Sequence, residues 1–387
     1  MLKVAYISPA YFSNVDISYI NEMKNYCDIY YFAIIYPSIK GCAIELDAAH
    51  CQSGIYEAID LPEMNRFDTF VDLRKTKLII RNQKHSWDLQ NFILTKHLYS
   101  LLKKEHFDVI HVTQPFSFFE WPLLAMRNKI VLSVHDPFRH SSQRSQLVAI
   151  YRSIMFRSLS HFIIFNQSQK QDFINHYHLQ DKHVYDSALS TYSYLQIYAH
   201  PTQLSNHYAL FLGKIYSYKG LEYLFPAMKK VHEKHPDFKL VVAGGGQFYF
   251  DISPYKNCDY IDIRNYYYSD EEQANLIANA DFLVCPYNDA TQSGVIMSAY
   301  AFNKPCLVTR TGGLPEMVGN GEYGVIIPPR DTQALVDAMN KMIENPELLQ
   351  EYSHKIHKEY YEEKKSWKYL AQEIVMNVYT PMKNHRE

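Results

Sequence analysis

Short apolar runs and amphipathic stretches alternate along most of the chain. Runs rich in β-branched and aromatic residues, bounded by turn-forming residues, predict strands at residues 2–8, 28–36, 107–112, 130–135, 162–166, 208–213, 239–243 and 260–263. Between them, apolar residues at helical spacing predict helices, among them residues 14–26, 89–104, 221–235, 331–344 and 367–379. Strands that alternate with helices run parallel, so the pattern predicts an α/β fold with doubly wound sheets.

The alternation weakens over residues 182–206, where polar residues and Pro201 replace the apolar runs. At 387 residues the chain exceeds the size of one ordinary core, so we interpret this break as a domain boundary. We predict a first domain over residues 1–195, a linker over 196–207, a second domain over 208–365 and a final helical segment over 366–387.

Two polar loops in the second half each precede a helix. Residues 288–294 contain no bulky apolar side chain and are followed by small and apolar residues at 295–302. Residues 311–316 repeat the arrangement with Gly312, Gly313 and a Pro-Glu pair, which suits a tight turn and a first helical turn. A helix N-terminus offers unpaired N–H groups, so the two loops predict a site for a nucleotide or diphosphate.

Composition and charge narrow the class of protein. A hydrophobic content of 47% with 21% charged residues is typical of a globular protein. The formal charge of −2 excludes the broad positive field that a general nucleic-acid-binding protein has. The six cysteines form no CxxC pair, which favours reduced thiols in a cytoplasmic protein over disulfides or a zinc site. The pattern shows no signal peptide and no apolar run long enough to span a membrane.

A basic stretch in the first half departs from this neutral balance. Residues 137–171 contain no Asp or Glu, and apolar residues interleave there with the basic residues Arg139, Arg144, Arg152, Arg157 and Lys170. A basic amphipathic helix suits an anionic membrane surface or a phosphorylated lipid acceptor; an ordinary surface helix packed on the sheet is the alternative. A second basic run, over residues 74–84, lies in the same domain.

Four sequence blocks follow one another in the second half, at residues 211–220, 240–246, 280–286 and 299–316. They carry Gly-Lys…Lys-Gly, a strand ending in three glycines, Ala-Asp-Phe-Leu-Val-Cys-Pro, and Lys-Pro…Gly-Gly-x-Pro-Glu. In this order they resemble the motifs of the retaining, nucleotide-sugar-dependent glycosyltransferases of family 4. Looser matches lie at residues 107–111 and 134–136, and the helix after Ser366 resembles the C-terminal helix of that family.

This resemblance implies a GT-B fold, in which two Rossmann-like domains face a cleft and the C-terminal helix crosses back to the first. It implies that Lys214 and Lys219 act on the donor diphosphate, together with the loop residues Gln292, Ser293, Gly294, Gly312 and Gly313. It also implies that His135, at a strand end, contacts the sugar or the acceptor, although a structural histidine is the alternative.

Cofactor chemistry is not expected at this site. The chain has no Asp-x-Asp pair, so we expect neither a metal nor another cofactor. The two lysines and the two helix N-termini would instead neutralise a leaving diphosphate.

The chain departs from the family pattern at one pair of positions. Where the family has Glu-x7-Glu, counted back from residues 304–305, this chain has Ala290 and Ser298. We expect Ser298 to bind the ribose as a neutral partner, with Asp289, Thr291 and Glu316 beside the donor sugar or ribose.

Loss of both carboxylates leaves three functions open. A variant transferase can let the leaving phosphate take the acceptor proton. A non-catalytic binding subunit and a GT-B-like nucleotide-sugar epimerase are the alternatives.

We predict a retaining hexosyltransferase that moves a sugar from a nucleotide-sugar donor to a glycan or lipid-linked acceptor in surface polysaccharide biosynthesis. The expected location is the cytoplasm, with peripheral attachment to the inner face of a membrane. The basic residues Arg139, Arg144, Arg152 and Arg157 would contact that acceptor or membrane surface, and no nucleic acid is expected as a partner.

Overall fold

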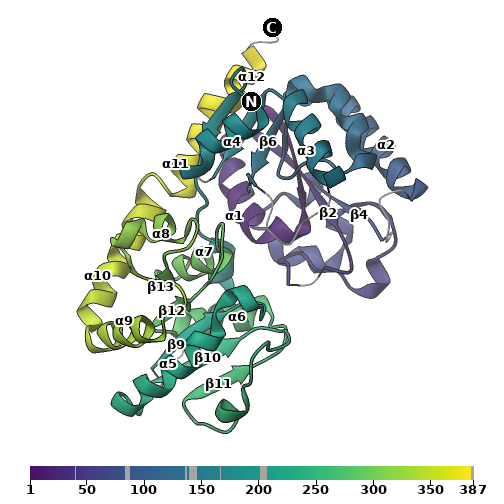
Figure 1. The fold of residues 1–387 in the computed structure, drawn as a ribbon. Coiled ribbons are helices and arrows are strands. Elements are labelled where there is room, and N and C mark those ends of the chain that lie inside the picture. Colours follow the sequence, from purple (N-terminus) through teal and green to yellow (C-terminus); the bar gives the residue numbers. More distant parts are fainter. Residues whose placement is uncertain are drawn as a thin grey trace. The chain divides into compact units, whose positions relative to one another are not determined.

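The computed structural model divides the chain into two compact units (Figure 1). It describes residues 1–39, 41–82, 88–135, 137–138, 146–165, 167–200 and 207–384. Unit 1 combines Met1–Leu189 with Trp367–Glu387, and unit 2 comprises Ser190–Ser366. Unit 1 is therefore built from both ends of the sequence, whereas unit 2 is one continuous stretch.

Unit 1 is organised around a sheet of eight described strands in the order β3-β4-β2-β1-β5-β6-β7-β8. These are β1 (Lys3–Pro9), β2 (Asp28–Ile35), β3 (Gly54–Glu57), β4 (Thr76–Ile80), β5 (Val109–Val112), β6 (Ile130–Val134), β7 (His161–Ile164) and β8 (His183–Asp186). All neighbours pair in parallel except β3, which runs antiparallel to β4 at one edge. The parallel sheet is confirmed, although the apolar pattern did not indicate β3, β4 or β8.

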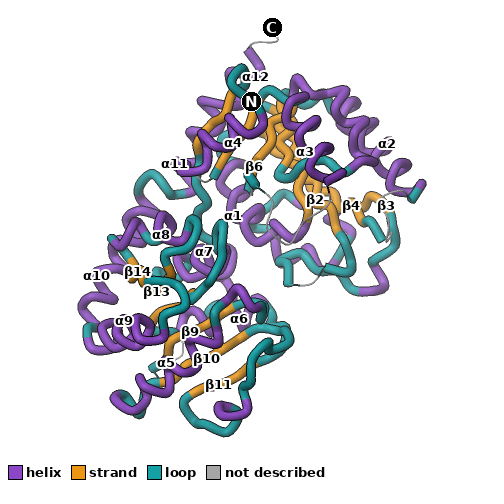
Figure 2. The backbone as a smooth tube through the Cα atoms, in the orientation of Figure 1, coloured by secondary structure: helices purple, strands orange, loops and turns teal. Residues whose placement is uncertain are grey.

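Helices cover both faces of this sheet, and Figure 2 shows the strands lying between them. They are α1 (Ser13–Met23), α2 (Leu89–Lys104), α3 (Gln146–Ser158), α4 (Lys170–Tyr177), α11 (Trp367–Ile374), α12 (Thr380–Asn384), the 3₁₀ helix η6 (Phe118–Lys129) and the π-helical turn η13 (Val375–Tyr379). On one face, Leu98 of α2, Leu123 of η6 and Phe156 of α3 share a single apolar core with Ile7 and Leu132 of the sheet. The three helical elements α2, η6 and α3 thus form one layer over this face.

The opposite face of the sheet carries buried polar side chains. The carboxylate of Asp16 on α1 accepts hydrogen bonds from the Tyr6 hydroxyl at 2.7 Å and the Tyr31 hydroxyl at 3.3 Å. Burial raises the pKa of Asp16 to about 7, since water no longer solvates the charged form.

The C-terminal segment of the chain is tied to the same face by hydrogen bonds. The Tyr379 hydroxyl lies 2.5 Å from Nδ1 of His111 on β5 and 3.0 Å from the Tyr19 hydroxyl on α1. The other ring nitrogen of His111 lies 2.7 Å from Oγ of Ser133. Buried polar groups need such partners, so this network fixes the returning helix against α1 and the sheet.

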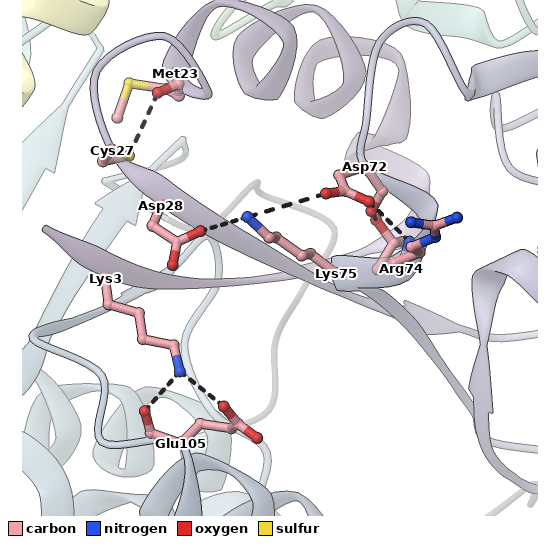
Figure 3. Close-up of polar contacts among 9 residues, drawn as sticks. Lys3, Met23, Cys27, Asp28, Asp72, Arg74, Lys75 and Glu105 are labelled. Atoms are coloured by element: carbon pink, nitrogen blue, oxygen red, sulfur yellow. Dashed lines mark hydrogen bonds and ion pairs between the residues drawn. The ribbon is translucent and has the colours of Figure 1, made fainter. Parts of the chain in front are cut away.

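Charged side chains near β1 and β2 are paired (Figure 3). Nζ of Lys3 lies 2.7 Å from Oε2 of Glu105, and Nζ of Lys75 lies 2.7 Å from Oδ1 of Asp28 and 4.0 Å from Oδ2 of Asp72. Figure 3 also shows the thiol of Cys27 donating to the Met23 carbonyl, at 3.4 Å.

Three basic side chains of the second basic run, residues 74–84, form such ion pairs. Beyond Lys75, the Lys77 ammonium pairs with Glu57, and the buried Arg81 guanidinium lies 3.5 Å from Oε1 of Glu120. Within the described residues 74–82, Lys75, Lys77 and Arg81 are therefore each paired with a carboxylate, and Lys84 lies outside the described residues.

Unit 2 contains a second sheet, in which the described strands pair in parallel in the order β11-β10-β9-β12-β13-β14. The strands are β9 (Tyr208–Leu212), β10 (Lys239–Ala243), β11 (Ile261–Arg264), β12 (Phe282–Cys285), β13 (Cys306–Thr309) and β14 (Gly324–Ile327). The helices are α5 (Leu221–Lys234), α6 (Asp270–Asn279), α7 (Gly294–Tyr300), α8 (Leu314–Met317), α9 (Thr332–Glu344) and α10 (Pro346–His357). The side chain of Ser269 caps α6 by accepting a hydrogen bond from the Glu272 amide.

The segment that precedes β9 packs within unit 2. The Tyr192 amide donates to the Met297 carbonyl at 3.2 Å, and Nε2 of Gln196 donates to the Ala301 carbonyl at 2.6 Å. Of the predicted linker over residues 196–207, residues 201–206 lie outside the described part of the chain. None of the helices described here combines the length and the apolar character needed to cross a membrane.

Candidate functional site

Three loops meet at the carboxyl ends of the central strands of unit 2. They follow β9, β12 and β13, and the carboxyl edge of a parallel sheet is where such folds bind ligands. The Asn288 amide donates to the Tyr218 carbonyl at 2.7 Å, which joins the first loop to the second. The Gly313 amide donates to the Thr291 carbonyl at 3.1 Å, which joins the second loop to the third.

Two glycines allow this close approach. Gly220 has φ of 72°, and a Cβ atom there would lie 1.9 Å from the Pro286 carbonyl oxygen. Gly312 has φ of 50°, and a Cβ atom there would lie 1.5 Å from the Ala290 carbonyl oxygen. Only glycine fits either position, so the glycines serve the contact between loops as well as the turn itself.

Lys219, in the loop after β9, places its ammonium against aromatic rings. Its Nζ atom lies 3.6 Å from the ring centroid of Tyr287 and 5.3 Å from that of Tyr218. Burial lowers the pKa of Lys219 to about 8, and no described carboxylate pairs with it. A ring face holds the cation without cancelling its charge, so the N–H donors remain available to an anion.

Lys214 occupies a different environment in the same loop. Its side chain is exposed, and Nζ lies 5.9 Å from the ring centroid of Tyr267. The following amide, that of Ile215, donates to the Gly245 carbonyl at 3.1 Å, so the loop after β9 also abuts the loop after β10. Lys214 can reach an anion in solvent but is not held as Lys219 is.

The helices after the two polar loops are short. Helix α7 has seven residues and α8 has four, so a long helix dipole contributes little at either place. The amides of Gly294 and Val295 begin α7 and have no hydrogen-bond partner among the described residues. This loop therefore offers individual N–H groups, rather than a helix dipole, to an anion.

Several predicted site residues line the same three loops. Asp289, Gly312 and Glu316 are exposed, while Thr291 and Gln292 are half-buried. Ser293 is buried, with its Oγ 3.4 Å from the Tyr287 hydroxyl.

Ser298 lies deeper than a ribose contact requires. It is 2% exposed; its hydroxyl donates to the Gly294 carbonyl at 3.1 Å and accepts from Nε2 of Gln273 at 3.3 Å. The hydroxyl proton of Ser298 therefore already makes a hydrogen bond within unit 2.

Sequence reasoning missed three tyrosines that shape the site. The rings of Tyr287 and Tyr218 hold the Lys219 ammonium. Tyr218 directly precedes Lys219 in the sequence, which was the available signal, whereas Tyr287 follows the block at residues 280–286. The Tyr192 hydroxyl lies 2.7 Å from where a Cβ atom on Gly294 would be. Tyr192 is distant in sequence and carries no signal of this contact.

His135 lies in unit 1, at the end of β6. Its ring stacks on Phe12 with centroids 4.2 Å apart and lies 4.7 Å from the Phe165 ring. Burial lowers the pKa of His135 to about 4, so the imidazole is neutral at ordinary pH and can donate or accept a hydrogen bond.

The predicted basic residues of unit 1 are divided between described and undescribed positions. Arg139 and Arg144 lie outside the described residues. Arg152 of α3 lies with its guanidinium carbon 5.2 Å from the Phe156 ring centroid, and Nε of Arg157 donates to the Tyr177 carbonyl at 3.4 Å. The predicted basic amphipathic helix exists as α3.

We also searched the described residues for side chains that could hold a metal ion. There, no group of three or more His, Cys, Asp or Glu side chains is arranged to hold a metal ion.

Two family models match the chain in succession. The model for Glycosyltransferase Family 4 matches residues 64–185, and the model for Glycosyl transferases group 1 matches residues 198–359, which include both lysines and all three loops. An uncharacterised glycosyltransferase of Methanocaldococcus jannaschii is 29% identical over 177 residues, which make up 44% of this chain and 44% of the relative. The chain spans less than half the length of the curated relatives it matches.

Solved structures resemble the chain over nearly its whole length. Sucrose-phosphate synthase from Thermosynechococcus elongatus has a TM-score of 0.69 at 15% identity, covering 99% of this chain and 100% of that one. HepE of Anabaena, in complex with UDP, has a TM-score of 0.66 at 14% identity, covering 98% and 100%. These likenesses show the fold, and together with the two doubly wound sheets they confirm the predicted GT-B class.

Proposed function

We propose, from the premise that the chain belongs to the group 1/family 4 glycosyltransferases, that unit 2 binds a nucleotide-sugar donor by its diphosphate. The observation that carries this proposal is the uncancelled charge of Lys219. Its ammonium rests on Tyr287 beside the two loops predicted for an anion. The UDP bound by the Anabaena structure is a ligand of the proposed chemical class.

We propose that different residues of the three loops contact the diphosphate and the sugar and ribose of the donor. Lys219 and the amides of Gly294 and Val295 take the diphosphate, and the exposed Lys214 adds a second cation. Asp289, Thr291 and Glu316 are the proposed partners of the sugar and ribose hydroxyls, because their side chains are accessible. Ser298 would join them only if its bond to the Gly294 carbonyl opened.

The proposed reaction is a transfer with retention at the anomeric carbon. The bond from that carbon to the donor phosphate oxygen breaks, and the acceptor oxygen bonds to the carbon on the same face. The acceptor proton passes to the leaving phosphate oxygen, so no carboxylate is required at Ala290 or Ser298. Lysines and amide N–H groups stabilise the charge that develops on the phosphate. His135, neutral and at a strand end, is the proposed hydrogen-bonding partner of the sugar or acceptor.

The proposed acceptor is a glycan or lipid-linked glycan of a surface polysaccharide, and the proposed donor unit is a hexose. We propose that the site uses no metal, because the lysines and amide N–H groups supply the charge that a metal would. The rival functions differ in their products. A binding subunit gives no turnover, and an epimerase converts the sugar without an acceptor.

Thermal shifts with UDP-, GDP-, ADP- and CMP-sugars test donor binding first. Binding to the folded state raises the melting temperature by mass action. The nucleotide-sugar with the correct base should therefore give the largest rise in melting temperature. Lys219→Ala should remove the shift, while Lys229→Ala, an exposed lysine on α5, should retain it. Equal shifts in wild type and Lys219→Ala would contradict the site.

Product analysis with the selected donor then tests the chemistry. Incubation with and without a glycan acceptor, followed by NMR of the anomeric configuration, should show the donor's configuration in the product. Sugar conversion without acceptor would instead identify the epimerase, and binding without any product the inactive subunit.

A further inference from the structure

Five exposed apolar side chains lie on three neighbouring elements of unit 1, α2, η6 and α3. Leu89 and Ile93 of α2 are 73% and 45% exposed, Phe118 of η6 is 38%, and Ile150 and Ile154 of α3 are 58% and 50%. We refer to these five residues as the apolar patch. Single exposed apolar residues are ordinary, but a connected group of them marks an interaction site.

Aromatic contacts join the three elements that carry the apolar patch. The ring of Phe92, next to Ile93, lies 6.0 Å from that of Phe118, and the Trp121 and Tyr151 rings stack at 4.8 Å. The Phe118 ring lies 6.4 Å from Tyr151, which follows Ile150. The three elements thus form a continuous surface.

The apolar patch faces away from the core. The inward side of these three elements packs on the sheet, because Leu98, Leu123 and Phe156 belong to the buried core of unit 1. Leu89 and Ile93 are four residues apart on α2, as are Ile150 and Ile154 on α3, so each pair shares one side of its helix. Figure 1 shows α2 and α3 beside each other on unit 1.

The same elements carry a one-sided charge. Their basic residues are Lys96, Lys103, Lys104, Arg127, Lys129, Arg152 and Arg157. Their one acidic residue, Glu120, is buried and paired with Arg81 at 3.5 Å. Glu105, which follows α2, pairs with Lys3. These three elements therefore combine exposed apolar groups with positive charge and present no exposed carboxylate of their own.

We propose that the apolar patch docks on an anionic lipid bilayer, with the isoleucines and Leu89 entering the interface. The exposed basic residues Lys96, Lys103, Lys104 and Arg127 would face lipid phosphates. A bilayer offers apolar and anionic groups over one extended plane, which matches apolar pairs flanked by cations. Trp121 and Tyr151, between the pairs, are residue types enriched at membrane interfaces. This surface extends beyond α3 to α2 and η6, and it does not rest on the proposed donor chemistry.

Vesicle co-sedimentation with the full chain tests this surface. Wild type should bind equimolar phosphatidylcholine and phosphatidylglycerol vesicles, bind pure phosphatidylcholine more weakly, and dissociate as salt rises. Ile150→Gln/Ile154→Gln should weaken binding by roughly ten- to a hundred-fold, because two apolar side chains that would enter the bilayer are lost. The matched control is Ile59→Gln/Ile197→Gln, which changes two isoleucines that are 47% and 50% exposed elsewhere.

A variant with altered charge measures the electrostatic contribution to vesicle binding separately from the apolar contribution. Lys96→Glu should weaken binding to anionic vesicles by roughly ten-fold and leave binding to phosphatidylcholine unchanged, whereas Lys229→Glu should do neither. The proposal fails if wild type does not sediment at low salt, or if the patch and control variants behave alike. It also fails if light scattering shows a dimer that the Ile150→Gln/Ile154→Gln variant dissolves, since a second copy would then cover the patch. UDP affinity, measured in parallel, should be the same in all variants, so failure of donor binding remains distinguishable.

Discussion

Lys219 holds its proton only weakly, and this has a consequence at the scale of one residue. Burial lowers the pKa of Lys219 to about 8, well below that of a lysine in an unfolded chain. The unfolded chain therefore binds more protons above pH 8, so without ligand this residue makes stability rise with pH in that window. A bound diphosphate reverses the balance, because it favours the charged form.

We therefore expect donor affinity to depend on pH. UDP affinity should be constant below about pH 7 and fall by roughly ten-fold per unit above pH 8, as the ammonium loses its proton. Calorimetry in buffers of different ionisation enthalpy should show proton uptake on binding near pH 8.

Lys219→Arg provides the control for this pH profile. Arginine keeps its charge throughout this range, so the variant should lose the pH dependence even if its affinity is lower. A wild-type affinity that stays constant to pH 9.5 would show that Lys219 does not meet the diphosphate.

At the scale of elements, the loops after β9, β12 and β13 act as one assembly. Gly312 shows this most directly, since its backbone presses on the Ala290 carbonyl. Gly321 offers a matched position, with φ of 105° and no atom within 4 Å of the place where a Cβ atom would lie. Neither glycine belongs to an α-helix or a strand.

Gly312→Ala should therefore do more damage than Gly321→Ala. Both variants bear about 1–2 kcal/mol of backbone strain from a left-handed conformation. Only Gly312→Ala must also separate the loops, so its UDP affinity should fall at least about ten-fold while that of Gly321→Ala stays unchanged. Isothermal calorimetry on both variants decides this; equal affinities would mean that the loops bind independently.

The sequence predicted these loops because local chemistry determines them. Glycines at left-handed turns, a polar loop before small residues and the Lys-x4-Lys spacing all act over a few residues. The burial of Ser298 was not predictable, because it depends on Gln273 of another helix. The edge strands β3 and β8 escaped prediction for a related reason. Their residues are half or fully exposed, so they lack the apolar run that marks a central strand.

At the scale of the whole molecule, the return of the chain to unit 1 depends on Tyr379. Its hydroxyl satisfies both His111 and Tyr19, which are buried. Tyr379→Phe would leave a buried imidazole nitrogen and a buried hydroxyl short of a partner. The cost should be about 1–3 kcal/mol of the free energy of unfolding of unit 1.

Tryptophan fluorescence measures this unit selectively. The chain has three tryptophans, and Trp87, Trp121 and Trp367 all belong to unit 1. The denaturation midpoint seen by fluorescence should fall for Tyr379→Phe and not for Tyr56→Phe, which alters a half-buried tyrosine on β3 of the same unit. Identical midpoints would mean that the hydroxyl network does not hold the helix.

The composition of unit 1 from both ends of the chain has a consequence for how the protein is made. Synthesis proceeds from the amino terminus, and domains generally fold as units as they emerge. Unit 2 is complete once Ser366 has left the ribosome, but unit 1 still waits for the helix that begins at Trp367. The unit translated first is thus finished last, and until then His111 and Tyr19 have no Tyr379 to meet them. A nascent chain stalled before Trp367 would carry a folded second half and an incomplete first half.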